Sequence, residues 1–328
     1  MQQTSRSMMP LAGVILIAVA SPFVMPVNIA NEILVFAVFA MATNLVVGVS
    51  GLISFGQAAL FGMGAYTAGY FLSKAGLPLI PSVVLAAIAG AALAALIGAI
   101  SIRRANFYFM MLTFAFGQMA YYVALTWSSV TGGEDGMSGI KRPPLDLGFL
   151  EPLNLNSAAA YYAFSAFLFV VSFYVLQRVQ NSALGLVLKA AKENPRRTAS
   201  LGYSVYRAQI IAFAISGAFA GLAGAMYALL YRFVPIDSVH WALSGNVVFM
   251  VVIGGTASML GPIFGAAVFV WLQGLFSLIW ARWALLFGLF IILVVFTLPG
   301  GIVDMFSKSR LRNPFRGRTA PVKKGTVL

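Results

Sequence analysis

The chain has 328 residues, of which 61% are hydrophobic and only 9% are charged. A soluble globular chain is about half apolar and about a quarter charged, so this composition excludes a soluble enzyme, a nucleic-acid-binding domain and a disordered protein. The net charge of +13 lies in short basic segments between apolar runs, as the positive-inside rule of membrane proteins predicts. The absence of cysteine and the single histidine, His240, exclude disulfides, thiolate metal sites and histidine-rich metal sites. We therefore expect an all-α polytopic membrane protein.

Ten segments are candidate membrane-spanning helices, because each holds about 20 mostly apolar residues. Residues 1–20 can also be interpreted as a signal peptide, but an uncleaved first span is favoured because Arg6 is the only basic residue ahead of the apolar run. The eighth segment is the weakest, since Gly254 and Gly255 interrupt it, and a re-entrant or broken helix is the alternative there. In chain order the segments are residues 11–27, 30–49, 52–72, 82–100, 107–127, 158–177, 208–231, 243–258, 260–280 and 283–299.

The charges between these segments predict the orientation of the chain. If both termini lie in the cytoplasm, 16 of the 21 Lys and Arg residues fall on the cytoplasmic side. Most of the acidic residues fall on the outer side, and this contrast is the one that the positive-inside rule describes. We therefore expect a single transmembrane domain over residues 1–328, with a cytoplasmic loop at 179–206 and a basic cytoplasmic tail at 300–328.

The cytoplasmic loop at 179–206 contains a well-marked short helix at about residues 195–201. Asn194 is a good N-cap, and Pro195 occupies the first helical position, where its missing N–H costs nothing. Gly202 is placed to end the helix in the left-handed conformation. A short capped helix between two membrane helices suits the docking of a cytoplasmic partner, and a basic loop bound to anionic lipid headgroups is the equal alternative.

The longest outer segment, residues 128–157, contains four glycines in eight residues, at 132, 133, 136 and 139. Such glycines mark tight turns. Glu134 and Asp135 make the segment locally acidic, but the pair is too isolated to suggest catalysis. The segment is either a turn-rich connector or an element that caps the pathway or contacts an external protein.

The interiors of the spans are almost free of ionisable side chains. Machines driven by protons or voltage usually need such groups in the membrane, and the chain also lacks the phosphate-binding loop of an ATPase, so energy must come from elsewhere. Small residues at Gly217 and Gly221, and again at Gly261 and Gly265, predict close helix packing. The few polar side chains in spans either line a pathway or bond neighbouring helices; the pathway candidates are Asn44, Gln57, Gln118 and Asn246.

Four segments of the chain together resemble a known family. They are residues 44–66 (NLVVGVSGLISFGQAALFGMGAY), 131–140 (TGGEDGMSGI), 182–227 and 252–262 (VIGGTASMLGP). The chain is similar in these segments to the permease subunits of branched-chain amino acid ABC importers, the LivM type. The resemblance covers most of the chain between about residues 40 and 270.

The resemblance implies an ABC importer permease fold in a bacterial cytoplasmic membrane. It implies a second permease of the same type, two cytoplasmic ATPases that bind the ATP, and a periplasmic or extracellular substrate-binding protein, so the chain itself would need no cofactor. Urea, short-chain amides and some aromatic acids are alternative substrates of this transporter type. The ATPase contact is expected at Ala190, Glu193, Arg196, Arg197, Ala199 and Gly202.

Two other classes of protein compete with the permease interpretation. A self-contained secondary transporter or channel is disfavoured by the lack of intramembrane charge. An intramembrane enzyme needs a nucleophile and base, a carboxylate pair or metal ligands within reach of one another. The spans offer almost none of these groups, so we expect no enzymatic activity.

Overall fold

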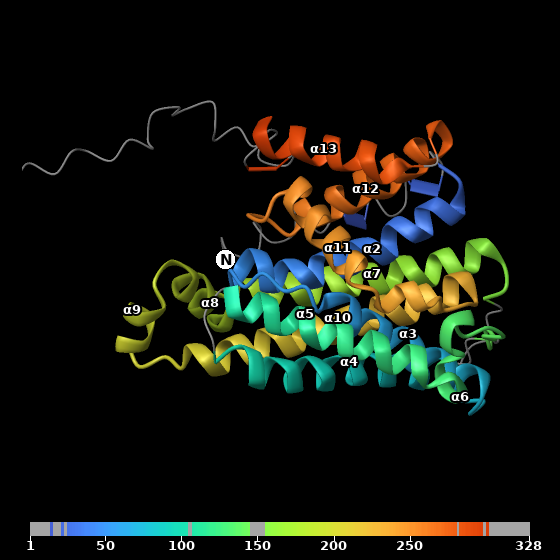
Figure 1. Ribbon diagram of the computed structural model, residues 1–328, viewed down its shortest axis with the longest axis horizontal. Coiled ribbons are helices and arrows are strands. Elements are labelled where there is room, and N and C mark those ends of the chain that lie inside the picture. The colour runs from blue at the N-terminus through green and yellow to red at the C-terminus, as the bar shows by residue number, and fades with distance from the viewer. Residues whose placement is uncertain are drawn as a thin grey trace, which may run out of the picture.

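The computed structural model describes residues 14–15, 21–22, 25–103, 107–144, 155–280, 282–297 and 300–301. The first expected span at 11–27, its signal-peptide alternative and the basic tail at 300–328 fall largely outside these residues. The described part is a bundle of helices whose long members run roughly side by side (Figure 1). In chain order they are α2 (Val27–Asn44), α3 (Gln57–Ser73), α4 (Leu79–Ser101), α5 (Phe107–Thr126), α7 (Ala158–Gln180), α10 (Val205–Tyr231), α11 (Trp241–Gly254), α12 (Leu260–Ile279) and α13 (Trp283–Thr297).

Six helices in the described part of the chain are long and apolar enough to cross a membrane. They are α4, α5, α7, α10, α12, and α2 together with the π-helical turn η1 (Leu45–Val49) that continues it. This confirms the expectation of an all-helical polytopic membrane protein. Because α3 and α11 are shorter and the first span is not described, the number ten and the cytoplasmic location of both termini stay predictions.

Helix α10 lies at the centre of the bundle and packs against α2, α3 and α4. Its glycines permit this close contact: a Cβ added to Gly221 would lie 2.6 Å from the carbonyl oxygen of Ala86, and one added to Gly217 would lie 2.5 Å from that of Gly90. Gly261 and Gly265 make equally close backbone contacts between α12 and α11. The small-residue pairs therefore pack helices together, as the sequence predicted.

One expected span begins later than the sequence predicted. The segment at 52–72 was expected to be helical throughout, but α3 begins only at Gln57. Residues 50–56, which we call the break, connect η1 to α3 without helical structure. Gly51 starts this change of direction with a φ of 74°, a left-handed conformation that glycine adopts without strain. The interruption expected at Gly254 and Gly255 is confirmed, because α11 ends at Gly254 and Gly255 has a φ of 99°.

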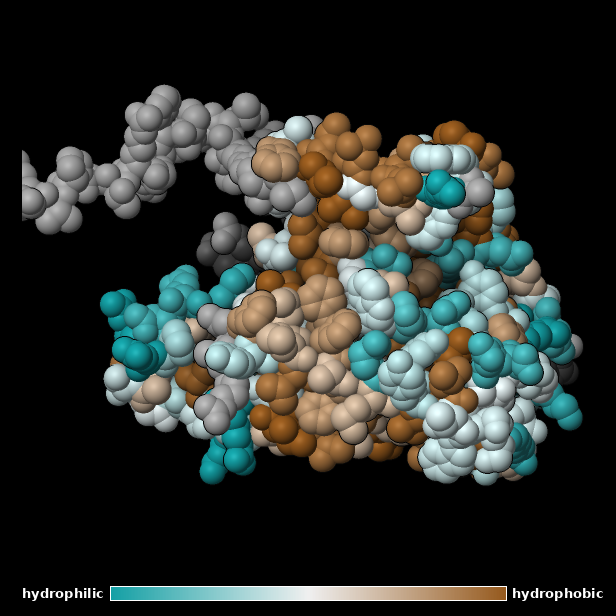
Figure 2. Space-filling model, in the orientation of Figure 1, coloured by the Kyte–Doolittle hydropathy of each residue, from teal (hydrophilic) through white to brown (hydrophobic). Residues whose placement is uncertain are grey.

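The surface separates apolar and polar residues along the long axis of the bundle. Hydrophobic residues cover much of the middle of the visible face, and hydrophilic residues gather at the end formed by α8 (Ala183–Glu193) and α9 (Pro195–Ser200) and at the opposite end (Figures 1 and 2). Charged residues within the long described helices follow the same division: Glu32, Arg178 and Arg207 all lie within two turns of a helix end. An apolar belt between two polar ends is the surface expected of a membrane-spanning bundle.

Candidate functional site

The loop at 179–206, which the sequence predicts to be cytoplasmic, forms two short helices, α8 and α9, that project from one end of the bundle (Figure 1). Ser182 caps α8, and the Asn194 side chain accepts a hydrogen bond from the Arg197 amide at 3.0 Å to cap α9. Pro195 is the first residue of α9, and Gly202 follows its end with a φ of 87°. The N-cap, the proline and the left-handed glycine are all confirmed, and together they fix a short rigid helix between α8 and α10.

Burial on α8 and α9 separates an anchored face from an accessible one. Gly185, Leu188, Ala191 and Thr198 are buried. The six residues expected to meet an ATPase are all exposed: Ala190, Glu193, Arg196, Arg197, Ala199 and Gly202. The large apolar side chains of Leu186, Leu201 and Tyr203 are exposed on the same element, with 63%, 72% and 55% of their surface accessible. Exposed apolar side chains among arginines are a composition typical of protein interfaces.

Helices α5 and α11 pack against the end of the break that leads into α3. A Cβ added to Gly56 would lie 2.8 Å from the Thr113 carbonyl oxygen on α5, and Gly245 of α11 faces the Phe55 ring. The backbone donors that the missing helix leaves free find side-chain acceptors. Thr113 Oγ1 accepts from the Phe55 amide at 3.2 Å, Ser54 Oγ from the Gly56 amide at 3.3 Å, and Ser244 Oγ from the Ala58 amide at 2.8 Å.

These contacts explain how irregular backbone exists inside the bundle. In hydrocarbon an unpaired amide costs several kcal/mol, so a break is tolerated only where protein supplies partners. Neither Ser244 nor this role of Thr113 follows from the sequence, because the acceptors come from α5 and α11, far along the chain from the break.

The four polar pathway candidates come from the elements around the break. Asn44 ends α2 and Gln57 begins α3, and both are fully buried. Gln118 follows Gly117 on α5, Asn246 follows Gly245 on α11, and both are half-buried. The structure thus gathers all four around one region, although it does not place their side chains along one channel.

The hydrogen bonding of the candidates is incomplete. The Ser216 hydroxyl lies 3.5 Å from Gln57 Oε1 and donates more closely, at 2.7 Å, to the Ala42 carbonyl. Gln57 Nε2, Asn44 Oδ1 and Gln118 Oε1 are buried and have no partner among the described residues. Unsatisfied buried amides are costly in stability and rare. Polar atoms held in this state are consistent with a site that a polar ligand or water completes.

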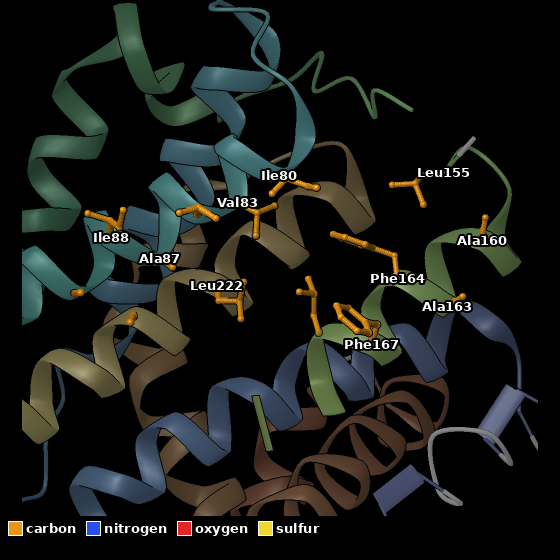
Figure 3. Close-up of a pocket in the computed structure, with 14 residues that line it drawn as sticks. Ile80, Val83, Ala87, Ile88, Leu155, Ala160, Ala163, Phe164, Phe167 and Leu222 are labelled. Atoms are coloured by element: carbon orange, nitrogen blue, oxygen red, sulfur yellow. The ribbon is translucent and has the colours of Figure 1, made fainter. Parts of the chain in front are cut away.

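The grooves on the bundle surface have a different chemistry. A groove of about 730 Å³ lies between α4 and α7 above α10, and Figure 3 shows Ile80, Val83 and Phe167 among the side chains around it. All of its lining residues are apolar. A zwitterionic solute would lose its hydration there without gaining partners, so this groove suits hydrocarbon and not an amino acid. A second groove, of about 640 Å³, lies between α3, α4 and α5 and includes Tyr66 and Thr67.

The described part of the glycine-rich loop, which the sequence predicts to lie outside, is fixed to the bundle by its own contacts. Met137 pairs through its backbone with Val234, and Met137 and Ile140 pack against Gly69 of α3. Glu134 and Asp135, in the 3-10 turn η2 (Gly133–Asp135), stay exposed. The described part of this loop therefore packs against the bundle, and the side chains of its acidic pair remain exposed.

Arg142 at the end of this loop makes structural contacts that the sequence did not predict. Its guanidinium donates to the carbonyl oxygens of Leu229 at 2.5 Å and Leu230 at 2.6 Å, in the last turn of α10. The same group lies 4.3 Å from the centre of the Tyr161 ring on α7. A cation at a helix C-terminus is favourable because the last carbonyls lack helical partners. Arg142 thus ties the outer loop to α7 and α10.

Comparison with known proteins assigns the bundle to a family. The family model described as the permease component of branched-chain amino acid transport systems matches residues 25–296. The chain belongs to this permease family. It is 30% identical over 318 residues to the high-affinity branched-chain amino acid transport system permease protein LivM of Salmonella typhimurium. The aligned region covers 90% of this chain and 74% of that protein. LivM of Escherichia coli is 29% identical over 316 residues, with the same coverage.

No solved structure matches the chain. The family and its LivM relatives nevertheless define what kind of molecule this is: a membrane permease subunit of an ABC importer. The family is a transport component and not an enzyme family. The transport subunit therefore contains both the exposed helices α8 and α9 and the break.

Proposed function

We propose that the chain forms half of a pathway for branched-chain amino acids, beside a second permease of the same type. The observation that carries this proposal is the family match over residues 25–296. The bundle supports it, because charged side chains of the long described helices lie only near the helix ends. An apolar amino acid carries its own opposite charges, so it needs no fixed countercharge along its path.

Two cytoplasmic ATPases supply the energy in this proposal, and a substrate-binding protein delivers the amino acid from outside. Both termini and α8–α9 lie in the cytoplasm of a bacterium, and ten helices cross its inner membrane. The excess of Lys and Arg on one side of the expected spans supports this orientation. The ATPases close on ATP, and the permease pair then changes the side on which its pathway is open.

The ATPase contact in this proposal is the exposed face of α8 and α9. All six residues expected there are accessible, and Leu186, Leu201 and Tyr203 add apolar area to it. Thr198 of α9 is buried and α9 contacts both α8 and α10, so a displacement of its exposed face is passed on to these two helices.

Co-purification tests the subunit assignment. We expect a tagged chain, extracted from its native membrane in mild detergent, to bring with it a second permease and ATPase subunits that mass spectrometry identifies. Recovery of the chain alone, together with solute flux after its reconstitution, would identify a self-contained transporter instead.

Uptake by the complete importer in proteoliposomes tests the substrate. With the matching binding protein, we expect leucine uptake that depends on ATP and that valine and isoleucine inhibit. Inhibition by urea, short-chain amides or aromatic acids, without inhibition by valine and isoleucine, would assign the importer to one of those substrate classes.

Charge reversal on α9 tests the docking face. We expect Arg196→Glu with Arg197→Glu to lower transport per ATP hydrolysed by about fivefold or more, the range of a typical coupling energy. The matched control is Arg178→Glu with Arg207→Glu, which makes the same charge change on exposed cytoplasmic arginines outside α8 and α9. Equal uptake by both double variants, with equal membrane insertion, would refute docking through α9.

A further inference from the structure

The inner side of α8 makes a specific contact with the helix that leads into the break. The Lys192 ammonium donates to the carbonyl oxygen of Gly48, in η1, at 2.7 Å. The stem of the same side chain lies over Gly51, where an added Cβ would be 2.7 Å from Lys192 Cγ. Lys192 therefore binds η1 and covers the first residues of the break with one side chain.

The position of Gly48 makes this contact a junction of three parts of the fold. A Cβ on Gly48 would overlap the Asn44 carboxamide of α2 and would lie 3.0 Å from the carbonyl oxygen of Thr256, in the turn between α11 and α12. A polar cleft of about 470 Å³ contains Gly48, Lys192 and Thr256. The free carbonyls at the end of a helix favour a cation, so the ammonium is well placed there.

The helix that receives the contact is irregular. Residues 45–49 form a single π-helical turn, closed by the Ser50 amide donating to the Leu45 carbonyl at 3.2 Å. The Leu52 amide donates to the Val46 carbonyl at 3.0 Å, across an even wider turn. Single π turns are uncommon and occur often at functional sites, and they interrupt the regular bonding that makes a helix stiff. A small displacement at Gly48 can therefore change the conformation of η1 and the break.

We propose that Lys192 is the positioning residue that connects the α8–α9 element to the break in the pathway. Ala190, Lys192 and Glu193 are all exposed and Ala191 is buried, but only the Lys192 ammonium makes a partly buried contact with the Gly48 carbonyl. One short helix thus carries both the accessible face and the inward contact. The inference rests on the proposed function, because it describes how a movement imposed on α8 reaches residues 48–56.

The test uses the complete importer with three variants of this subunit. Lys192→Met keeps the length of the side chain and removes the ammonium, and Lys192→Arg keeps the charge. Lys189→Met is the matched control, because Lys189 borders the same cleft one turn earlier on α8 and no hydrogen bond from it is found among the described residues. Co-purified ATPase, ATP hydrolysis and leucine transported per ATP are measured for each variant.

We expect Lys192→Met to keep its ATPases and their hydrolysis but to lose about fivefold or more in leucine transported per ATP. Lys192→Arg should recover most of that ratio, and Lys189→Met should stay close to the unsubstituted protein. An unchanged ratio in Lys192→Met, or an equal loss in Lys189→Met, would overturn the proposal.

Hydrogen exchange on the purified subunit tests the contact without transport. Since hydrogen bonds to charged groups add to local stability, we expect amides of residues 48–52 to exchange about tenfold faster in Lys192→Met, with residues 216–226 of α10 unchanged. Equal exchange in the two proteins would overturn the proposal even if Lys192→Met failed to assemble. An importer that carries another solute would refute the proposed substrate and leave the exchange result intact.

Discussion

Removal of the Arg142 guanidinium should destabilise the subunit more than its place in a loop suggests. Arg142→Met deletes two short hydrogen bonds to the Leu229 and Leu230 carbonyls and the contact 4.3 Å from the Tyr161 ring. A hydrogen bond to a charged group contributes about 1.5–3 kcal/mol and a cation–π contact about 0.5–2 kcal/mol. Because the site is half-exposed and water can reach the freed carbonyls, we expect a net loss of about 2 kcal/mol.

The assay is unfolding of the purified chain from mild detergent by added dodecyl sulfate, followed by circular dichroism. Arg142→Lys keeps the charge, but an ammonium lacks the planar fork with which a guanidinium reaches two carbonyls at once. It should therefore recover only about half of the lost stability. Lys141→Met is the control, because Lys141 is the exposed neighbouring cation. If Arg142→Met and Lys141→Met unfold within about 0.5 kcal/mol of each other, capping of α10 by Arg142 is refuted.

Four further substitutions test helix packing, a buried hydrogen bond and a left-handed backbone conformation. Gly221→Ala should lower the free energy of unfolding by about 1–3 kcal/mol, because the added Cβ pushes α10 away from α4. In the control Gly274→Ala the added Cβ meets nothing within 4 Å, so stability should rise by up to about 1 kcal/mol. Unfolding by dodecyl sulfate compares the two variants. Ser244→Ala leaves the Ala58 amide without its acceptor and should cost about 1–3 kcal/mol in the same assay. Gly202→Ala places an L-residue at a φ of 87° and should cost about 1–2 kcal/mol, seen as faster proteolysis next to α9.

Local chemistry determined much of this protein from the sequence. In a bilayer, an apolar run of about 20 residues can satisfy its backbone N–H and C=O groups only by forming a helix. The spans that became α4, α5, α7, α10 and α12 were therefore predictable. The cap at Asn194 and the stop at Gly202 depend on neighbours within a few residues, and both were predicted correctly. The six contact residues on α8 and α9 came from the family resemblance and not from these short-range signals, and the structure supplies their exposure.

The break and the junctions of the fold depended on tertiary structure alone. Residues 50–56 have the hydropathy of a membrane helix but do not form one. The Phe55 amide bonds to Thr113 of α5, and the Ala58 amide at the start of α3 bonds to Ser244 of α11. Arg142 gave no sequence signal beyond its charge, since its partners are backbone carbonyls 87 and 88 residues away. Hydropathy and capping are local properties that a sequence displays directly, whereas the partner of a buried polar group is fixed only when distant helices meet.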